Sequence, residues 1–249
     1  MSLTVAAVFA APGLAVGSFL NVVAARLPLR RSLSHPRSSC LSCGAEIRAR
    51  DNIPLLSYAL LRGRCRSCGE RIPLRYPAVE LVTALLVAAC GLRFGLTPYA
   101  VLAAGFCAVL VAVSAIDLEH RIVPNRIVLP AAAVVLAAQL VRDPSLEWPV
   151  AALGASGFLL AAALAYPRGM GMGDVKLALL LGAMLGWTVS VALLAGLLAA
   201  AVPAVAILIR RGRAARGVGI PFAPFLSLGA IVALFAGQPL LDWYLARLG

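Results

Sequence analysis

Long apolar segments constrain this chain more than any other feature. Eight runs approach the roughly 17–25 residues that an α-helix needs to cross a membrane, and they lie at about 3–25, 77–95, 98–117, 127–142, 149–166, 175–188, 188–209 and 222–246. The fourth and sixth runs are short. The only candidate turn between the sixth and the seventh is Gly186-Trp187-Thr188. We therefore predict an all-α fold with about eight transmembrane helices.

The composition places the chain among polytopic membrane proteins. Of its 249 residues, 62% are hydrophobic and only 13% are charged, with a mean hydropathy of +0.95. Soluble domains have about 45–50% apolar and about 25% charged residues. The net charge of +12 would indicate nucleic acid as a partner of a soluble protein, but here the arginines lie between the apolar runs. There they set the topology and contact anionic headgroups, so we predict membrane lipid and no nucleic acid as a partner.

The basic residues also predict which side of the membrane each loop occupies. With eight spans, one side holds 19 of the 22 Lys and Arg residues, in the segments 26–76, 117–126, 167–176 and 210–221. The positive-inside rule makes that side cytoplasmic, and both termini are then expected outside. The predicted regions are a first transmembrane helix over 1–25, a cytoplasmic zinc-binding loop over 26–76 and a transmembrane core over 77–249.

The loop 26–76 carries two C-x-x-C pairs, each followed by a glycine: Cys40-Leu41-Ser42-Cys43 and Cys65-Arg66-Ser67-Cys68. Two such pairs at this separation are typical of a four-thiolate zinc site. Two disulfides or idle cysteines are the alternative, and a reducing cytoplasm argues against disulfides. Four thiolates leave no open coordination position for a reacting water. We therefore predict a structural Zn2+ ion held by Cys40, Cys43, Cys65 and Cys68.

Two carboxylates lie at the ends of apolar runs. Asp117 ends the run 98–117, and Asp174 directly precedes the run 175–188, after the glycine turn Gly171-Met172-Gly173. Ionisable groups in or beside membrane spans are costly and by default indicate a function. Ordinary polar residues at helix ends are the alternative. Because the predicted topology puts both aspartates on the cytoplasmic side, we expect them to form one catalytic site.

Four further residues are candidates for substrate binding. Gly171 and Gly173 have no side chains, so their backbone would let an extended peptide approach closely. Lys176 adds a positive charge near Asp174. Glu80, about one turn into the second apolar run, either reaches the cytoplasmic interface with its long side chain or binds substrate or cofactor.

Two aspartates in one site favour the chemistry of an aspartyl protease. One must be ionised to take a proton from water, and the other must be protonated to polarise the scissile carbonyl. Like charges close together divide the titration in this way. Asp174 lies at the amino end of its helix, where the dipole favours negative charge, and Asp117 lies at a carboxyl end, where it does not. We predict Asp174 as the resting base and Asp117 as the acid, within a pair that titrates as a unit.

Besides the two thiol pairs and Gly171-Met172-Gly173-Asp174, six further short motifs are spread along almost the whole chain. They are Gly17-Ser18-Phe19-Leu20-Asn21, Arg26-Leu27-Pro28, Asp51-Asn52-Ile53-Pro54-Leu55-Leu56-Ser57-Tyr58, Arg75-Tyr76-Pro77, Ile116-Asp117-Leu118 and Ile220-Pro221-Phe222. In this order they resemble the bacterial type IV prepilin peptidases, membrane aspartyl proteases of the Gly-x-Gly-Asp class. The chain departs from that family where Asn125 replaces an acidic residue after Pro124, where Leu41-Ser42 lacks a proline, and where Ala223 replaces a glycine.

The resemblance implies a substrate, a location and a second activity. Such enzymes remove the basic leader from type IV prepilins and type II secretion pseudopilins, after a glycine, at the cytoplasmic face of the bacterial inner membrane. It implies Asp117 and Asp174 as the catalytic pair and zinc on the four cysteines. Many members then N-methylate the new amino terminus with S-adenosylmethionine, so this methyl donor is expected as a cofactor by analogy alone.

Two other kinds of protein would also place carboxylates near membrane spans. A transporter or channel would tend to show internal repeats, which we do not find, and it has no use for a thiolate loop. A nonenzymatic zinc-loop scaffold of a secretion machine would keep its cysteines and tolerate the loss of Asp117 and Asp174. Cleavage of a prepilin-like peptide distinguishes the enzyme from both.

Overall fold

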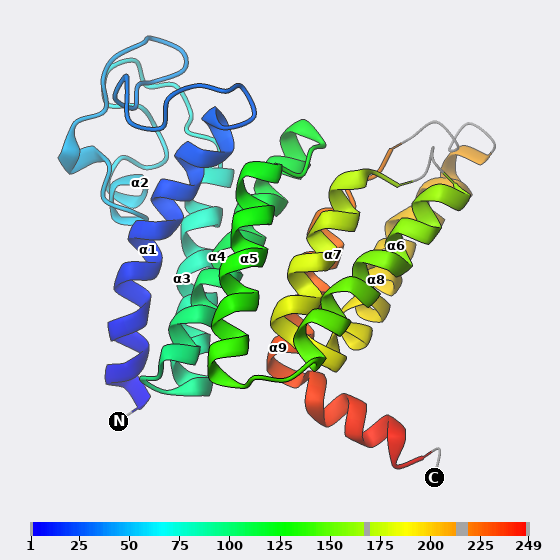
Figure 1. Cartoon of the computed structure of the whole chain (residues 1–249). Coiled ribbons are helices and arrows are strands. Elements are labelled where there is room, and N and C mark those ends of the chain that lie inside the picture. Colours follow the sequence, from blue (N-terminus) through cyan, green and yellow to red (C-terminus); the bar gives the residue numbers. More distant parts are fainter. Residues whose placement is uncertain (1, 167–169, 213–218, 248–249) are drawn as a thin grey trace. The chain divides into compact units, whose positions relative to one another are not determined.

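The computed structural model describes residues 2–166, 170–212 and 219–247, which form helices joined by loops (Figure 1). Within these ranges there is no β-strand, only two isolated bridges in the loop after the first helix. Eight long helices match the eight predicted runs: α1 (Ser2–Arg26), α3 (Arg75–Phe94), α4 (Pro98–His120), α5 (Asn125–Arg142), α6 (Glu147–Ala165), α7 (Met172–Leu185), α8 (Val189–Arg211) and α9 (Ala223–Leu245). The predicted all-α fold is confirmed. The predicted segments 167–176 and 210–221 lie partly outside the described residues.

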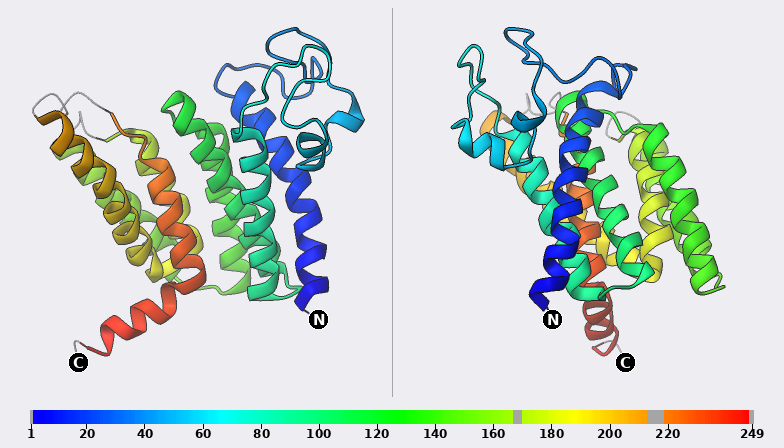
Figure 2. Two further views of the ribbon diagram at one scale, coloured as in Figure 1. Left: turned by 180° about the vertical axis from the view of Figure 1, so that it is seen from behind. Right: turned by 90° about the vertical axis from the view of Figure 1, so that its left-hand side faces the viewer.

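Seven segments of the described chain are long and apolar enough to cross a membrane, and one of them is the single stretch Met172–Arg210. This stretch is interrupted by η2 (Gly186–Thr188), at the predicted turn. Gly186 has a φ of 57°, a left-handed conformation that glycine adopts without strain. The chain reverses there, so that α8 runs back antiparallel to α7 (Figures 1 and 2). The protein is therefore a multi-pass membrane protein, with its sixth and seventh predicted runs folded as separate helices.

The first of two compact units is Met1–Ala115, in which α1 packs along α3. Two glycines lie on the packed face of α1. A Cβ on Gly17 would lie 2.7 Å from Cα of Glu80, and one on Gly13 would lie 2.9 Å from Cα of Ala84. This Gly-xxx-Gly spacing lets two membrane helices approach until their backbones touch. Packing of α1 on α3 therefore depends on both glycines.

The loop 27–74 joins α1 to α3 and contains two short helices, η1 (Ala49–Asp51) and α2 (Leu56–Leu60). Both views of Figure 2 show this loop at the end of the α1–α3 pair opposite the amino terminus. The side-chain amide of Asn21, near the end of α1, donates a 3.1 Å hydrogen bond to the main-chain oxygen of Tyr76. This hydrogen bond therefore links α1 to the start of α3, close to the two ends of the loop.

The second compact unit is Ile116–Gly249, in which α7 packs against both α5 and α6, and α8 packs against α9. Gly182 of α7 lies directly against the main chain of Ala151 of α6. The fully buried Gln139 of α5 donates a 2.9 Å hydrogen bond to the main-chain oxygen of Met184. Close backbone contact and one buried amide thus fix α7 between its neighbours.

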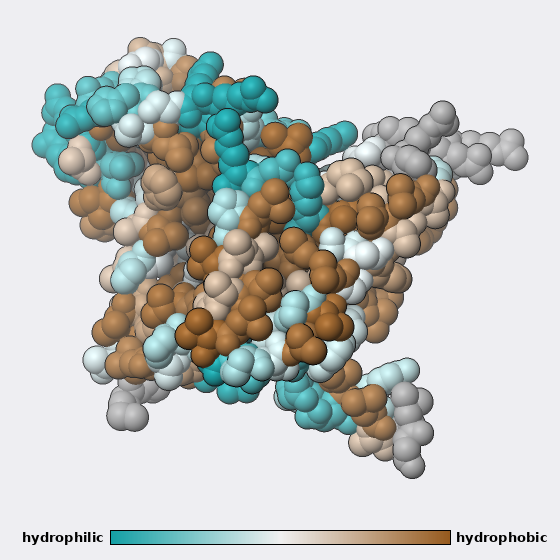
Figure 3. Space-filling model, in the orientation of Figure 1, coloured by the Kyte–Doolittle hydropathy of each residue, from teal (hydrophilic) through white to brown (hydrophobic). Residues whose placement is uncertain are grey.

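Large apolar side chains remain exposed on most of the helices. In the space-filling view of Figure 3, hydrophobic residues cover much of the helical surface, and hydrophilic residues gather over the loop 27–74. Exposed apolar surface of this extent is not stable against water and marks contact with another apolar phase. For helices of this length that phase is the hydrocarbon core of a bilayer.

Candidate active site

Asp117 is buried, with 6% of the residue exposed, and lies three residues before the end of α4. The helix continues to His120, beyond its predicted end. Oδ2 of Asp117 accepts a 3.1 Å hydrogen bond from the main-chain N–H of Ala223, the first residue of α9. The first N–H groups of a helix have no partner within their own helix. Asp117 is therefore carried by α4 and caps α9.

Asp174 lies in the first turn of α7 and is 8% exposed. The helix begins at Met172, three residues before the predicted run, and the main-chain N–H of Asp174 donates a 3.1 Å hydrogen bond to the oxygen of Gly171. The carboxylates of Asp117 and Asp174 interact electrostatically. Among the described residues, no other Asp or Glu is buried. The fold brings the two predicted aspartates into one site.

Gly173 packs against the segment that follows α4. A Cβ on Gly173 would lie 2.7 Å from Cβ and 3.1 Å from Cγ2 of Val123. Protein interiors have no room for such an approach, so any side chain at this position would push the start of α7 away from Val123. Because Val123 lies six residues beyond Asp117, the contact holds Asp117 and Asp174 near each other.

Gly171 and Lys176 flank Asp174 in different ways. Gly171 is exposed, and the nearest atom to a Cβ built on it would be Oδ2 of Asp174, at 3.7 Å. Its φ of −84° suits any residue, so its lack of a side chain provides open space beside the carboxylate. Nζ of Lys176 donates a 3.1 Å hydrogen bond to Oδ1 of Asn125, at the start of α5. Since that amide is neutral, it does not compensate the positive charge of Lys176.

Glu80 belongs to the first unit and holds the loop that precedes its helix. Its Oε2 accepts a 2.9 Å hydrogen bond from the main-chain N–H of Leu55. Leu55 has a φ of 59°, and the N–H of Leu56 donates to the oxygen of Pro54 across it at 2.6 Å, which forms a γ-turn. Such a backbone costs about 1–3 kcal/mol and persists only where its surroundings hold it. Glu80 is one of the groups that stabilise this turn.

The four predicted metal ligands lie together in the loop 27–74. All four Sγ atoms are within 4.8 Å of one another, and the thiols are free. The sulfur atoms of Cys40 and Cys68 are 3.8 Å apart, close to the roughly 3.8 Å between ligands of a tetrahedral ion with Zn–S bonds of about 2.3 Å. Hydrogen bonds from the N–H groups of Cys43 and Ser42 lower the pKa of the Cys40 thiol to about 6. The cluster, completed by Cys65, can hold a metal ion.

The two thiol pairs have matching backbone structures. The N–H of Gly44 donates to the oxygen of Cys40, and the N–H of Gly69 donates to the oxygen of Cys65, at 2.9 and 3.0 Å. Both glycines are left-handed, with φ of 70° and 74°. Each pair therefore forms the same tight turn, which directs two sulfur atoms towards a common centre.

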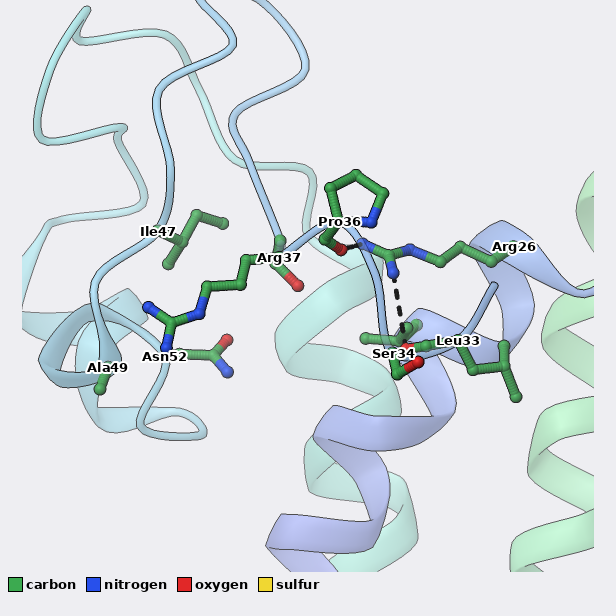
Figure 4. Close-up of a pocket in the computed structure, with 10 residues that line it drawn as sticks. Arg26, Leu33, Ser34, Pro36, Arg37, Ile47, Ala49 and Asn52 are labelled. Atoms are coloured by element: carbon green, nitrogen blue, oxygen red, sulfur yellow. Dashed lines mark hydrogen bonds between the residues drawn. The ribbon is translucent and has the colours of Figure 1, made fainter. Parts of the chain in front are cut away.

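A cavity of about 300 Å³ lies between the end of α1 and the loop (Figure 4). Its lining includes two arginines whose side chains already have partners. Arg26 donates hydrogen bonds to the main-chain oxygens of Ser32, at 3.1 Å, and Pro36, at 2.7 Å. Arg37 forms an exposed ion pair with Glu46 at 2.9 Å. These arginines stabilise the loop rather than form an anion site.

Two contributors to the aspartate site could not be identified from the sequence. They are the main-chain N–H of Ala223 and the side chain of Val123. Pro221 and Pro224 do indicate the start of a helix. No local pattern, however, shows which carboxylate caps that helix, because the partner lies 106 residues away in the chain.

The fold and the site define a narrow class: multi-pass helical membrane proteins with two buried aspartates at helix ends and a four-thiolate loop. The chain matches the Bacterial Peptidase A24 N-terminal domain over residues 12–94 and the Type IV leader peptidase family over residues 104–209. The chain belongs to the type IV leader peptidase family.

Curated relatives extend over nearly the whole chain. The prepilin leader peptidase/N-methyltransferase of Bacillus subtilis is 38% identical over 238 residues, which cover 94% of this chain and 95% of the relative. Its counterpart in Pseudomonas aeruginosa is 37% identical, and the match extends over 95% of this chain and 92% of the relative. The counterpart in Myxococcus xanthus is 44% identical, and that match extends over 70% of this chain and 54% of the relative. No solved structure matches the chain. The family expected from the motifs is confirmed.

Proposed function

We propose that this protein removes the leader peptide of type IV prepilins or type II secretion pseudopilins after a glycine, with Asp117 and Asp174 as the catalytic pair. The observation that carries the proposal is the burial of these two carboxylates in one site, since no other acidic residue of the described chain is buried. The names of the curated relatives, prepilin leader peptidase/N-methyltransferase, support the same reaction.

In the proposed mechanism the two aspartates share one proton. The ionised carboxylate takes a proton from water, and the water oxygen attacks the scissile carbonyl carbon. The protonated aspartate gives its proton to the carbonyl oxygen, which produces a gem-diol. As the C–N bond breaks, the first aspartate returns its proton to the leaving amine, and the second recovers a proton from the gem-diol. Both aspartates end in their starting states.

We propose Asp174, in the first turn of α7, as the base and Asp117 as the acid. Each carboxylate lies against a helix amino terminus, Asp174 at α7 and Asp117 at α9 through the N–H of Ala223. The helix dipole alone therefore does not separate their charge states. Two acids that interact in this way titrate as a pair.

The residues around Asp174 are proposed to receive the peptide. The open space at Gly171 and the bare backbone of Gly173 suit an extended chain, which pairs through its main chain. Lys176 carries a positive charge that would interact with an acidic group of the substrate. Glu80 is proposed to contribute to substrate binding indirectly, by holding the loop at Leu55.

We propose that the protein resides in the bacterial inner membrane with its aspartates on the cytoplasmic side. Arg121 directly follows α4, and Arg126 lies at the start of α5, and positively charged ends of spans face the cytoplasm. The first transmembrane helix, the zinc-binding loop and the protease core are proposed to occupy 1–25, 26–76 and 77–249.

We propose that the four thiolates bind Zn2+ in a structural role. The spacing of their sulfur atoms suits this ion. When bound, zinc would cross-link the two turns and would leave no position for a reacting water. Cys40, Cys43, Cys65 and Cys68 would be its ligands.

We also propose that the protein N-methylates the new amino terminus, with S-adenosylmethionine as the methyl donor. The proposal rests on the name of the curated relatives, prepilin leader peptidase/N-methyltransferase. The described residues do not define a site for this donor: the guanidinium groups of Arg26 and Arg37 in the loop cavity are already bonded. No residue is assigned to the methyl transfer.

The test is to mix the purified full-length protein, or its Asp117→Asn or Asp174→Asn variant, with a peptide that carries a basic leader, a glycine and a phenylalanine. We expect mass spectrometry to detect cleavage after the glycine by the wild type alone. Labelled S-adenosylmethionine in the same tube reports methylation of the product. Cleavage by either variant at a near-normal rate would refute the aspartyl mechanism.

A further inference from the structure

The short helix α2 is tethered beside a membrane-spanning helix. The N–H of Leu55, the residue before α2, is bonded to the side chain of Glu80, which is the sixth residue of α3. A helix rises about 1.5 Å per residue, so Glu80 lies about 7–8 Å along the axis from Arg75. Since α3 is a candidate membrane span, the tether holds α2 beside the first turns of that span.

In α2 the apolar residues are exposed and the polar residue is buried, the opposite of the arrangement in a helix of a soluble domain. Leu56 and Leu60, four residues apart and on one face, are 52% and 71% exposed, and the nearby Ile53 is 46% exposed. Ser57 is the buried residue: its hydroxyl donates to the oxygen of Arg50 and accepts from the N–H of Ile53. The helix directs its polar group inwards and its leucines outwards, as expected where the surroundings are apolar.

Exposed basic residues lie on either side of α2 along the chain. Arg50 precedes α2 and Arg62 follows it, and both are exposed. The segment 26–76 as a whole has 11 arginines and three acidic residues, Glu46, Asp51 and Glu70. An apolar face in a segment flanked by basic residues is the pattern of segments that lie in the interface of a membrane with anionic lipids.

We propose that α2 is an interfacial anchor that inserts into the lipid leaflet on the side of the loop. Leu56, Leu60 and Ile53 enter the boundary between headgroups and acyl chains, about 5–10 Å deep. Arg50 and Arg62 bind anionic headgroups. Lipid is the occupant because the tether to Glu80 keeps the helix beside a span, where the bilayer is the surrounding medium. The anchor holds the thiolate loop against the membrane, independently of the proposed peptide cleavage.

The test uses the full-length, metal-loaded protein in nanodiscs that contain anionic lipid. An azide-bearing amino acid replaces Leu60 and is coupled to an environment-sensitive dye. The matched control carries the dye at Leu41, which is 81% exposed in the first thiol turn of the same loop. Lipids with a doxyl group near the headgroup should quench the dye at position 60 at least about twofold more than the dye at position 41. Glu80→Ala should reduce this difference.

Several results would overturn the proposal. These are equal quenching at the two positions, no quenching at position 60, and shielding of position 60 only after a prepilin-like peptide is added, which would make the surface a substrate site. An unchanged signal in neutral lipid would overturn the headgroup role of Arg50 and Arg62. Equal metal content in both labelled proteins verifies folding, and a label at Leu56 replaces the one at Leu60 if that protein does not fold.

Discussion

Gly173 contacts Val123 so closely that a Cβ on the glycine would lie 2.7 Å from Cβ of the valine. The contact joins the residue before Asp174 to a segment that begins only a few residues after Asp117. A glycine beside an aspartate suggests access for a peptide, yet in the folded chain Gly173 also determines how near α7 can come to the end of α4. Its packing role and its proposed substrate role can be separated by mutation.

Gly173→Ala should lower both stability and peptide cleavage, because the added methyl group forces α7 away from Val123. Overpacking of this kind typically costs about 1–3 kcal/mol. Thermal unfolding in detergent measures the first effect, and the cleavage rate measures the second. Adding Val123→Gly to Gly173→Ala removes the atoms that clash. The double variant should therefore recover part of the stability and part of the cleavage rate, which a double-mutant cycle measures.

Gly157→Ala is the matched control for this change. A Cβ at Gly157 of α6 would meet nothing within 4 Å, and alanine is the better helix former. We expect unchanged cleavage and equal or higher stability. If Gly173→Ala behaved like Gly157→Ala, the close contact with Val123 would not matter for the site.

Asp117→Asn and Asp174→Asn should each reduce cleavage by about 10²–10⁴-fold, the usual contribution of a general acid or base. The amide at position 117 still offers an oxygen to the N–H of Ala223, so the fold should be kept and the loss should be chemical. Initial rates with a prepilin-like peptide measure it. Asp143→Asn, at an exposed position, is the control and should cleave normally.

Removal of the metal should loosen the loop without disrupting the aspartate helices. We expect one zinc ion per chain by elemental analysis, with much less in Cys43→Ser and Cys68→Ser. A strong chelator should speed amide hydrogen exchange across residues 40–70 and leave α7 protected. Cys90→Ala, at a buried cysteine outside the cluster, should keep its zinc. Loss of protection in α7 on chelation would contradict this independence.

Glu80→Ala should destabilise the loop more than Glu80→Gln. The alanine leaves the half-buried N–H of Leu55 without its acceptor, a loss of about 1 kcal/mol for a hydrogen bond that is not fully buried, whereas glutamine still presents an oxygen. Hydrogen exchange at the Leu55 amide measures the effect directly. Equal exchange in the two variants would mean that the hydrogen bond from Leu55 does not support the turn.

The amino-acid sequence by itself determined the class of protein and the eight helices, and it predicted the residues of both sites. These are local properties: a run of about 20 apolar residues specifies a membrane helix whatever its neighbours, and C-x-x-C followed by glycine specifies a turn with two thiolates. The short helices η1 and α2 escaped prediction because their few residues have no periodic pattern that separates them from loop.

Tertiary structure alone decided which neighbours hold these predicted groups in place. Asp117 accepts a hydrogen bond from Ala223, 106 residues away, and this contact gives it a helix amino terminus that its own helix does not provide. The contacts of Gly173 with Val123 and of Glu80 with Leu55 likewise join segments that are distant in the chain. Hydropathy determines that a helix lies in the membrane, but the choice of neighbour depends on how side chains of distant segments fit together at close-packed density, and that fit exists only in the folded chain.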